Sequence, residues 1–319
     1  MIHYLYPIFN LETGAPVWLN IHTATKLARE RIMGILQKLS ERKTAYSFEF
    51  FPPKTDTPLE AVYDAIEKLS SFDPAFISVT YGAGGGNKDR VVEIAEHLKN
   101  RNYEAIAHLT CVGADRDSIG AMLDSLDSKG IRNILALRGD LREGMDHSSA
   151  FSHYRHASDL IKDIKKRNVF TVGAAAYPET HMESGSPEED MRYMLYKEEL
   201  GADFFITQLC FDKNALIGFH DRARKAGVRA PIITGIMPVL NPSQITRMAL
   251  LSACSIPAQL SRIISRYGAN AEDFKKAGLD FAIDEIEFLI KNGVTKFHIY
   301  TMNRPEAARQ IIEGSSLNA

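Results

Sequence analysis

The sequence predicts an α/β fold, a (β/α)8 TIM barrel with an N-terminal helical extension and extra helices before the last strand. From residue 45 onward, short apolar runs alternate eight times with longer amphipathic segments. The chain has 319 residues, and such a barrel typically needs about 250. No linker or low-complexity tract interrupts the alternation. We therefore expect an extension over residues 1–44 and one barrel over residues 45–319.

The extension comes first. Residues 1–20 are rich in aromatic and turn-forming residues, and apolar side chains then recur at i, i+3, i+4, i+7 as Ile32, Ile35, Leu36 and Leu39. This spacing is typical of an amphipathic helix, which we expect to pack onto the barrel. The alternative is a lid or a subunit contact formed by the segment "YPIFNLETGAPVW".

The strands and helices of the barrel follow in order. Between the strand-like runs, residues 58–72, 89–101, 117–130 and 188–202 show helical periodicity, and several of these segments end in the Gly expected just past a helix. The interval 238–295 is much longer than the others and should hold the extra helices. The predicted strands are residues 45–51, 75–81, 104–110, 133–137, 170–177, 203–209, 231–237 and 296–300.

Composition excludes several classes of function. The chain is 45% hydrophobic and 24% charged, with 38 basic and 40 acidic side chains and a sequence pI near 6.6. These values are typical of a globular protein and give no general reason to bind nucleic acid or an anionic membrane. No apolar run approaches the roughly 18 residues of a membrane span, and the N-terminus does not resemble a signal peptide. We expect a cytoplasmic protein that forms a homo-oligomer and acts on a small molecule.

Cysteine and histidine spacing argues against a metal. Cys111, Cys210 and Cys254 are far apart and form no CxxC, so the sequence encodes neither a disulfide framework nor a zinc site. His108 and His181 each follow a predicted strand, but no HxH or HExxH spacing accompanies them. We expect these two imidazoles to hydrogen-bond a ligand or the core, and we expect no metal.

The residues at the ends of the predicted strands indicate an active site. In a barrel of this class the chemistry lies at the C-terminal ends of the strands. Polar, aromatic or glycine-bearing residues stand at all eight ends. The eight segments read "EFFPP", "TYGAGGGNKDR", "HLTC", "LRGD", "AYPETH", "TQLCFD", "GIMPV" and "YTMNR".

Glu49 is the most informative of these residues. Strand alternation places Ser47, Glu49 and Phe51 on one face and Phe48 and Phe50 on the other. If the two phenylalanines face the helices, Glu49 points into the barrel mouth. A carboxyl group among apolar neighbours favours its protonated form, and such a group is a useful acid near neutral pH. The alternative is an inward glutamate that pairs with an arginine for structure alone.

Three other segments carry weaker signals. "GAGGGN" (82–87) fails the dinucleotide fingerprint because its sixth position is Asn87, so it predicts only a backbone that can approach a ligand closely. In "LRGD", Arg138 offers a fork of donors, Gly139 permits close approach, and Asp140 can stabilise positive charge; the alternative is a turn with a surface salt bridge. Gln208 both donates and accepts, which suits the edge of a heterocycle.

Taken together, these segments resemble the methylenetetrahydrofolate reductase family. "SFEFFPPKT", "FISVTYGAGG", "HLTC", "NILALRGD", "AAYPETH", "ITQLCFD", "PIITGIMPV" and "FHIYTMNR" look like its motif series, in the same order over residues 45 to 313. The resemblance implies a bacterial-type catalytic barrel holding FAD. The flavin takes a hydride from NADH or NADPH and passes it to 5,10-methylenetetrahydrofolate in a ping-pong sequence, giving 5-methyltetrahydrofolate.

The resemblance also implies roles for particular residues. Glu49 is the general acid that protonates folate N10, and Asp140 lies beside flavin and folate, where it stabilises the 5-iminium cation. Gln208 binds the pterin and the nicotinamide in turn, and Arg304 lies near the folate. The positions that match cofactor-binding residues are Thr80, Tyr81, Ala83, His108, Arg138, Gly139, Asp140, Tyr177, His181, Asp190, Lys197 and Tyr300.

Two departures from the family pattern leave alternatives open. Tyr193 and Tyr196 stand where family members commonly place Asn and Arg toward the FAD ribose and phosphates, and Met248 stands where an aromatic residue is common. One alternative keeps the folate and passes the hydride directly from NAD(P)H without flavin. Another is a non-catalytic folate-binding subunit, against which the intact Glu49, Asp140 and Gln208 argue.

Overall fold

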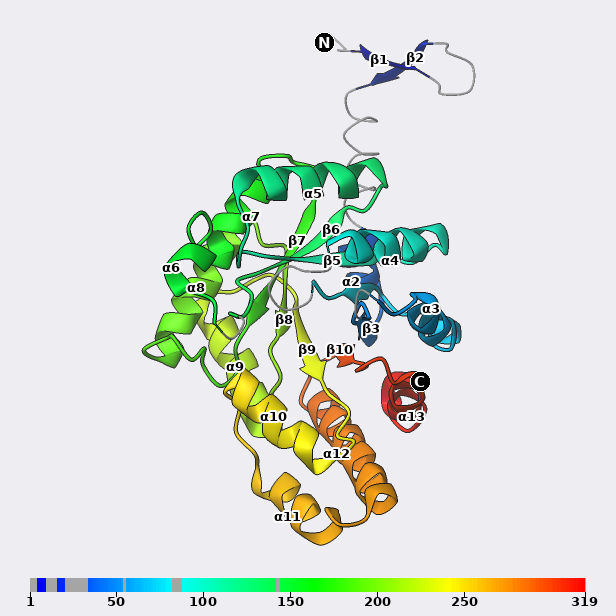
Figure 1. Ribbon diagram of the computed structural model, residues 1–319, viewed down its shortest axis with the longest axis vertical. Helices are drawn as coiled ribbons and strands as arrows, with labels where there is room; N and C mark the ends of the chain where they lie inside the picture. Colours follow the sequence, from blue (N-terminus) through cyan, green and yellow to red (C-terminus); the bar gives the residue numbers. More distant parts are fainter. Residues whose placement is uncertain are drawn as a thin grey trace.

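The computed structural model describes residues 5–9, 16–20, 34–53, 56–81, 88–141 and 144–318. Eight parallel strands close into a barrel, which confirms the predicted (β/α)8 fold (Figure 1). Each strand lies within the run that predicts it. Around the barrel the order is β10 (Lys296–Tyr300), β3 (Ala45–Phe50), β4 (Ile77–Val79), β5 (Ala105–Thr110), β6 (Asn133–Leu137), β7 (Thr171–Ala176), β8 (Phe204–Thr207) and β9 (Ile232–Ile236).

Helices connect the strands and surround the barrel (Figure 1). Side chains that suit N-caps begin several of them: Asp115 accepts a hydrogen bond from the backbone N–H of Ser118, and Ser186 accepts one from that of Glu189. The connecting elements are α3 (Glu60–Glu67), η1 (Ser70–Phe72), α4 (Lys88–Asn100), α5 (Arg116–Ser128), α6 (His147–Ala150), α7 (Ala157–Lys165), α8 (Pro187–Glu199) and α9 (Lys213–Ala226). After the last strand come α13 (Pro305–Glu313) and the 3-10 turn η3 (Ser316–Asn318).

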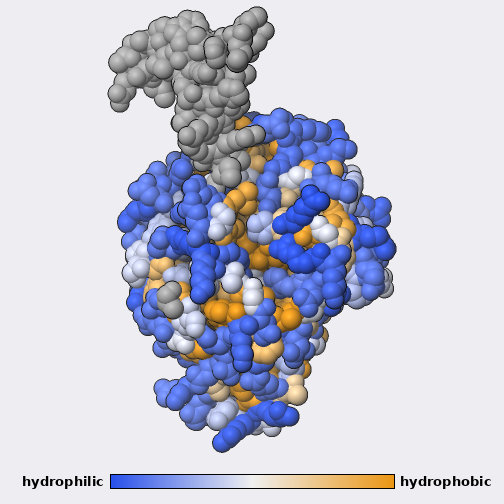
Figure 2. Space-filling view, turned by 180° about the vertical axis from the view of Figure 1, so that it is seen from behind, coloured by the Kyte–Doolittle hydropathy of each residue, from blue (hydrophilic) through white to orange (hydrophobic). Residues whose placement is uncertain are grey.

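The predicted extra helices lie between β9 and β10. They are α10 (Pro242–Ser252), α11 (Ala258–Tyr267) and α12 (Ala271–Lys291), and they form the lower part of the molecule in Figure 1. Helix α12 packs against α11, α9 and α13. Among the described helices, none is both long and apolar enough to cross a membrane. The face drawn in Figure 2 is mainly hydrophilic, with apolar residues in smaller areas between polar ones.

The barrel interior is apolar toward the N-terminal ends of the strands and polar toward their C-terminal ends. Phe48 and Phe50 are fully buried in the cluster formed with the surrounding helices, while Glu49 points inward, as strand alternation predicts. The apolar layer contains Phe76, Ile106, Leu135, Phe204, Ile206 and Ile233. Titratable interior groups are therefore concentrated at the end where the strand exits gather.

Helix α2 (Gly34–Glu41) closes the apolar end of the barrel. Its Ile35 and Leu39 are buried in the same cluster as that interior layer. The helix confirms the predicted amphipathic pattern, although Ile32 lies outside the described residues. Before it, β1 (Leu5–Phe9) and β2 (Pro16–Asn20) pair as an antiparallel hairpin. These two strands were not predicted, although two apolar runs separated by a Gly-containing segment are a hairpin signal.

Candidate active site

Two adjoining cavities at the C-terminal end of the barrel collect most of the predicted site residues. Leu137 and Ala175 line both. The first, here called the mouth cavity, has a volume of about 320 Å³ and is lined by Glu49, Thr80, Tyr81, His108, Gly139, Asp140, Gln208 and Tyr300. The second, here called the side cavity, has a volume of about 390 Å³ and is lined by Arg138, Tyr177, His181, Asp190 and Lys197.

Two predicted residues are not part of this group. Arg304 lines neither cavity; it faces a separate cavity of about 290 Å³ together with Leu240, Asn241 and Lys275. Ala83 lies outside the described residues, as does the whole "GAGGGN" segment. The structure therefore brings the strand-exit residues together but separates Arg304 from them.

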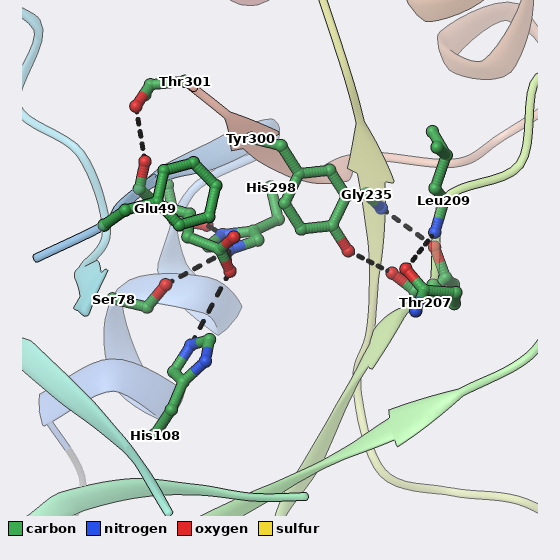
Figure 3. Close-up of polar contacts among 12 residues, drawn as sticks. Glu49, Ser78, His108, Thr207, Leu209, Gly235, His298, Tyr300 and Thr301 are labelled. Atoms are coloured by element: carbon green, nitrogen blue, oxygen red, sulfur yellow. Dashed lines mark hydrogen bonds and ion pairs between the residues drawn. The ribbon is translucent and has the colours of Figure 1, made fainter. Parts of the chain in front are cut away.

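Glu49 stands between two imidazoles at the base of the mouth cavity (Figure 3). Its Oε2 lies 3.6 Å from His108 Nε2 and 3.5 Å from His298 Nε2, and only 7% of the residue is exposed. Strand register places Glu49 opposite Ser78 of β4 and Tyr300 of β10. No arginine or lysine of the described chain pairs with this carboxyl group. The structure therefore does not support the alternative in which Glu49 pairs with an arginine for structure alone.

Two of the groups around Glu49, His108 and Tyr300, are neutral near pH 7. Burial lowers the pKa of His108 to about 4, although the nearby Glu49 charge opposes this effect. Burial also raises the pKa of Tyr300 well above its ordinary value, and the Glu49 charge adds to the rise. The carboxyl group therefore faces uncharged His108 and Tyr300 side chains rather than cations.

The turn after β10 fixes the end of β3. The Thr301 hydroxyl donates to the Glu49 carbonyl oxygen. The Asn303 side chain accepts from the Phe51 N–H and donates to the Phe51 carbonyl, both at 2.9 Å, as a neighbouring strand would. Asn303 has φ +52°, a left-handed conformation that Asn tolerates better than most residues. These bonds hold the backbone on both sides of Glu49.

Tyr300 and Gln208 form the opposite wall. The Tyr300 hydroxyl donates to the Thr207 carbonyl at 2.6 Å, and the Thr207 hydroxyl accepts from the Gly235 N–H at 2.9 Å (Figure 3). A Cβ on Gly235 would lie 2.6 Å from the Tyr300 ring, so this glycine makes room for the tyrosine. Gln208 Oε1 accepts from the Leu209 N–H at 2.8 Å, which leaves the amide N–H groups for a ligand.

The side cavity contains two cations, and the protein itself engages both. Arg138 forms an ion pair with Glu183 and lies 5.0 Å over the Phe151 ring. Lys197 donates to the Ala175 carbonyl at 2.5 Å, and burial lowers its pKa to about 8. Tyr193 and Tyr196 line the same cavity and are about half exposed.

Asp190, in the first turn of α8, holds the loop that carries His181. Its side chain accepts a hydrogen bond from the backbone N–H of His181 at 2.7 Å. The Tyr177 and His181 rings meet edge to face with centroids 4.6 Å apart. Burial raises the pKa of Tyr177 to about 12, and burial together with Arg138 lowers that of His181. Both rings are therefore neutral near pH 7 and can serve as hydrogen-bonding or stacking surfaces.

Sequence reasoning missed four residues around Glu49, namely Ser78, His298, Thr301 and Asn303. His298 could have been predicted, because it lies two residues before Tyr300 on β10 and so shares its inward face. The pair of hydrogen bonds between Asn303 and the Phe51 backbone, here called the backbone clamp, could not, because it forms only when the barrel closes.

Comparison with known proteins identifies relatives over most of the chain. The family model for methylenetetrahydrofolate reductase matches residues 34–316. The 5,10-methylenetetrahydrofolate reductase of Escherichia coli (strain K12) is 38% identical over 266 residues, which cover 83% of this chain and 88% of that protein. Methylenetetrahydrofolate reductase (NADH) 1 of Arabidopsis thaliana is 33% identical over 88% of this chain, a match that covers 50% of the plant protein.

A solved structure with a similar fold covers most of the chain. It is described as an uncharacterized protein from Clostridium thermocellum that binds two copies of 5-methyl-5,6,7,8-tetrahydrofolic acid. It aligns with a TM-score of 0.63 at 17% sequence identity, covering 88% of this chain and 97% of that one. At this identity the likeness shows a shared barrel fold.

Proposed function

The chain belongs to the methylenetetrahydrofolate reductase family, and on that premise we propose that it reduces 5,10-methylenetetrahydrofolate to 5-methyltetrahydrofolate with NADH or NADPH through FAD. The observation that carries this proposal is Glu49, a nearly buried carboxyl group that faces a cavity and has no cationic lysine or arginine partner in the described structure. A proton donor in this position supplies the acid that opens the folate imidazolidine ring.

No amino-acid side chain carries a hydride, so the reduction needs a cofactor beside the acid. The mouth cavity suits a planar polar ring. Leu135, Leu137 and Ile206 form an apolar floor, while His108 Nε2 and Thr110 Oγ1 are buried without a hydrogen-bond partner in the described chain. A ligand ring with donors and acceptors at its edge would satisfy both atoms. The residues present therefore fit a flavin.

The residues that would hold FAD divide between the two cavities. Thr80, Tyr81, His108 and Gly139 would surround the flavin ring in the mouth cavity. The rest of the cofactor would extend into the side cavity, toward Arg138, Tyr177, His181, Asp190 and Lys197. A bound FAD would supply the hydride, which it would receive from NADH or NADPH.

The protein's own groups would then carry the folate half-reaction. Glu49 gives a proton to folate N10, the N10–methylene bond breaks, and the electron pair of N5 forms the 5-iminium cation. Asp140, at the rim of the same cavity, stabilises that positive charge until the methylene carbon accepts the hydride. Gln208 orients the pterin and the nicotinamide in turn, and this shared use of one site accounts for ping-pong order.

A flavin-free reductase is the second candidate. The side cavity favours it, because Arg138 already pairs with Glu183, Lys197 is bonded to a backbone carbonyl, and Tyr193 and Tyr196 add no cation for a diphosphate. In this version the hydride passes directly from NAD(P)H to the folate, and Glu49 keeps its role.

Glu49→Gln tests the proposed acid. The change keeps the size of the side chain but removes the transferable proton. We expect folate reduction to fall by at least about 100-fold, while reduction of the flavin by NAD(P)H stays within about threefold, because only the folate step needs the acid. Stopped-flow spectroscopy measures the two half-reactions separately. Equal slowing of both would contradict the role, and unchanged turnover would remove Glu49 from the chemistry.

A further inference from the structure

His298 is the second imidazole beside Glu49, and its ring is completely buried inside the barrel. Its Nδ1 lies 2.7 Å from the Ser47 hydroxyl oxygen, and its Nε2 lies 3.3 Å from the Ser78 hydroxyl oxygen and 3.5 Å from Glu49 Oε2 (Figure 3). The Ser47 hydroxyl also lies 3.1 Å from the Phe297 carbonyl oxygen. A serine hydroxyl therefore contacts each ring nitrogen, and the number of protons these groups carry decides the tautomer of the ring.

Only one neutral arrangement places a proton in each hydroxyl contact. A serine hydroxyl has one proton, and a neutral imidazole has one N–H and one lone pair. If Ser47 donates to the Phe297 carbonyl, it must accept from His298 Nδ1–H. His298 Nε2 is then a lone pair, which accepts from the Ser78 hydroxyl. The opposite tautomer leaves Ser47 and the Phe297 carbonyl as two oxygens with no proton between them.

A doubly protonated ring would satisfy the same contacts, but it would be a cation with no solvent exposure. Its one anionic neighbour in the described chain, Glu49, lies 3.5 Å away, beyond a normal hydrogen bond. Burying a charge without a close, hydrogen-bonded partner is costly. The neutral ring with its proton on Nδ1 is therefore favoured.

We propose that His298, oriented by Ser47, faces Glu49 with an unprotonated nitrogen that offers no N–H donor, and so keeps that carboxyl group in its acid form for proton transfer. This inference rests on the proposed function. A carboxylate at Glu49 would find no N–H donor at His298 Nε2, because that nitrogen carries no proton and its one lone pair accepts from the Ser78 hydroxyl. A carboxylic acid needs no donor from this nitrogen. His298 is a positioning residue, since it acts on the substrate only through Glu49.

The other titratable groups facing Glu49 do not replace this effect. On β5, burial keeps His108 neutral, with its pKa lowered to about 4. On β10 and after β4, Tyr300 and Tyr81 have pKa values raised by burial and stay uncharged. Asp140, at the cavity rim, has no N–H group and so offers no donor to a Glu49 carboxylate.

Two single-hydroxyl variants test the proposal from opposite sides of the ring. Ser47→Ala removes the acceptor that fixes Nδ1–H, so the ring can move its proton to Nε2 and donate to a Glu49 carboxylate. In stopped-flow measurements of the folate half-reaction, the pH of half-maximal rate should move down by at least about one unit. That shift is roughly a tenfold loss of rate well above the midpoint and no loss at low pH. Ser78→Ala, the matched control, should not move the midpoint downward.

A spectroscopic readout separates this inference from the proposed function. In protein labelled with 15N-histidine, ring 15N–1H correlations report which nitrogen carries the proton, and His298→Gln identifies the His298 signals. We expect Nδ1–H in the wild type and Nε2–H in Ser47→Ala. A wild-type Nε2–H tautomer or an imidazolium would overturn the inference, as would an unmoved rate profile in Ser47→Ala. If the wild type shows Nδ1–H but reduces no methylenetetrahydrofolate, the proposed function fails instead.

Discussion

Glu49 and Glu285 are both nearly buried carboxyl groups, yet their surroundings differ. Glu49 faces a cavity where a ligand can take its proton. Glu285, on α12, is 3% exposed and lines none of the cavities described above, and its Oε1 has no hydrogen-bond partner within the described chain. Burial raises the pKa of Glu285 to about 8, although the Lys213 charge opposes the rise. Glu49 therefore stays the proposed acid, whereas the buried Glu285 carboxyl should lower stability.

The Glu285 carboxyl should make stability depend on pH. The folded state holds its proton up to about pH 8, whereas the unfolded chain loses it near the ordinary value of 4.5. Stability should therefore fall as pH rises from 4.5 through 8, because the unfolded state binds fewer protons in that window. Glu285→Gln should raise the free energy of unfolding by roughly 1–3 kcal/mol at pH 8.5 and change it little at pH 5.

Chemical denaturation at the two pH values measures this effect. Glu199→Gln, on an exposed position of α8, is the control and should change stability by less than about 0.5 kcal/mol at either pH. A Glu285→Gln protein that gains nothing at pH 8.5 would show that the buried carboxyl finds a partner.

At the level of elements, the spacing of apolar residues and the turn-forming residues were enough to predict all eight barrel strands and the extra helices before β10. Each strand is a short apolar run between helical segments, so its signal is local. The hairpin β1–β2 was not predicted, because its two strands are short and the turn-forming residues between them favoured an irregular segment. The clamp from Asn303 to Phe51 could not be read locally, because its partners lie 252 positions apart.

Helix α2 provides an element-scale test. Leu39 is 2% exposed within the cluster that closes the barrel, whereas its neighbour Ser40 is exposed. Leu39→Ala should lower the free energy of unfolding by about 2–4 kcal/mol, because it leaves a cavity among well-packed side chains. Ser40→Ala, the control, should change it by less than about 0.5 kcal/mol. Equal effects in urea denaturation would mean that α2 does not seal the barrel.

On the scale of the whole molecule, apolar and polar side chains occupy opposite ends of the barrel interior. Apolar side chains and α2 fill one end, while carboxyl, imidazole and phenol groups gather at the other. The sequence could predict which residues lie together, because a barrel places every strand exit at one end. Arg304 is the exception. A residue just beyond a strand exit can turn outward, and sequence order does not reveal that direction.

The three cysteines report on this packing. Cys111, Cys210 and Cys254 are buried, and burial raises the pKa of each thiol. Because the thiolate is the reactive form, native protein at pH 8 should react with Ellman's reagent at no more than a trace rate. All three thiols should react once guanidinium unfolds the chain. Rapid modification of one thiol in the native state would reveal local opening around it.

The most direct test of the proposed reductase is an absorption spectrum of the purified protein, before and after incubation with FAD. We expect flavin bands near roughly 380 and 450 nm that bleach with NADH or NADPH and return when 5,10-methylenetetrahydrofolate is added. A protein that stays colourless after FAD incubation, yet oxidises NAD(P)H only when that folate is present, would contradict the flavin route and establish direct transfer. Bands that bleach but do not return with the folate would contradict the folate reductase itself.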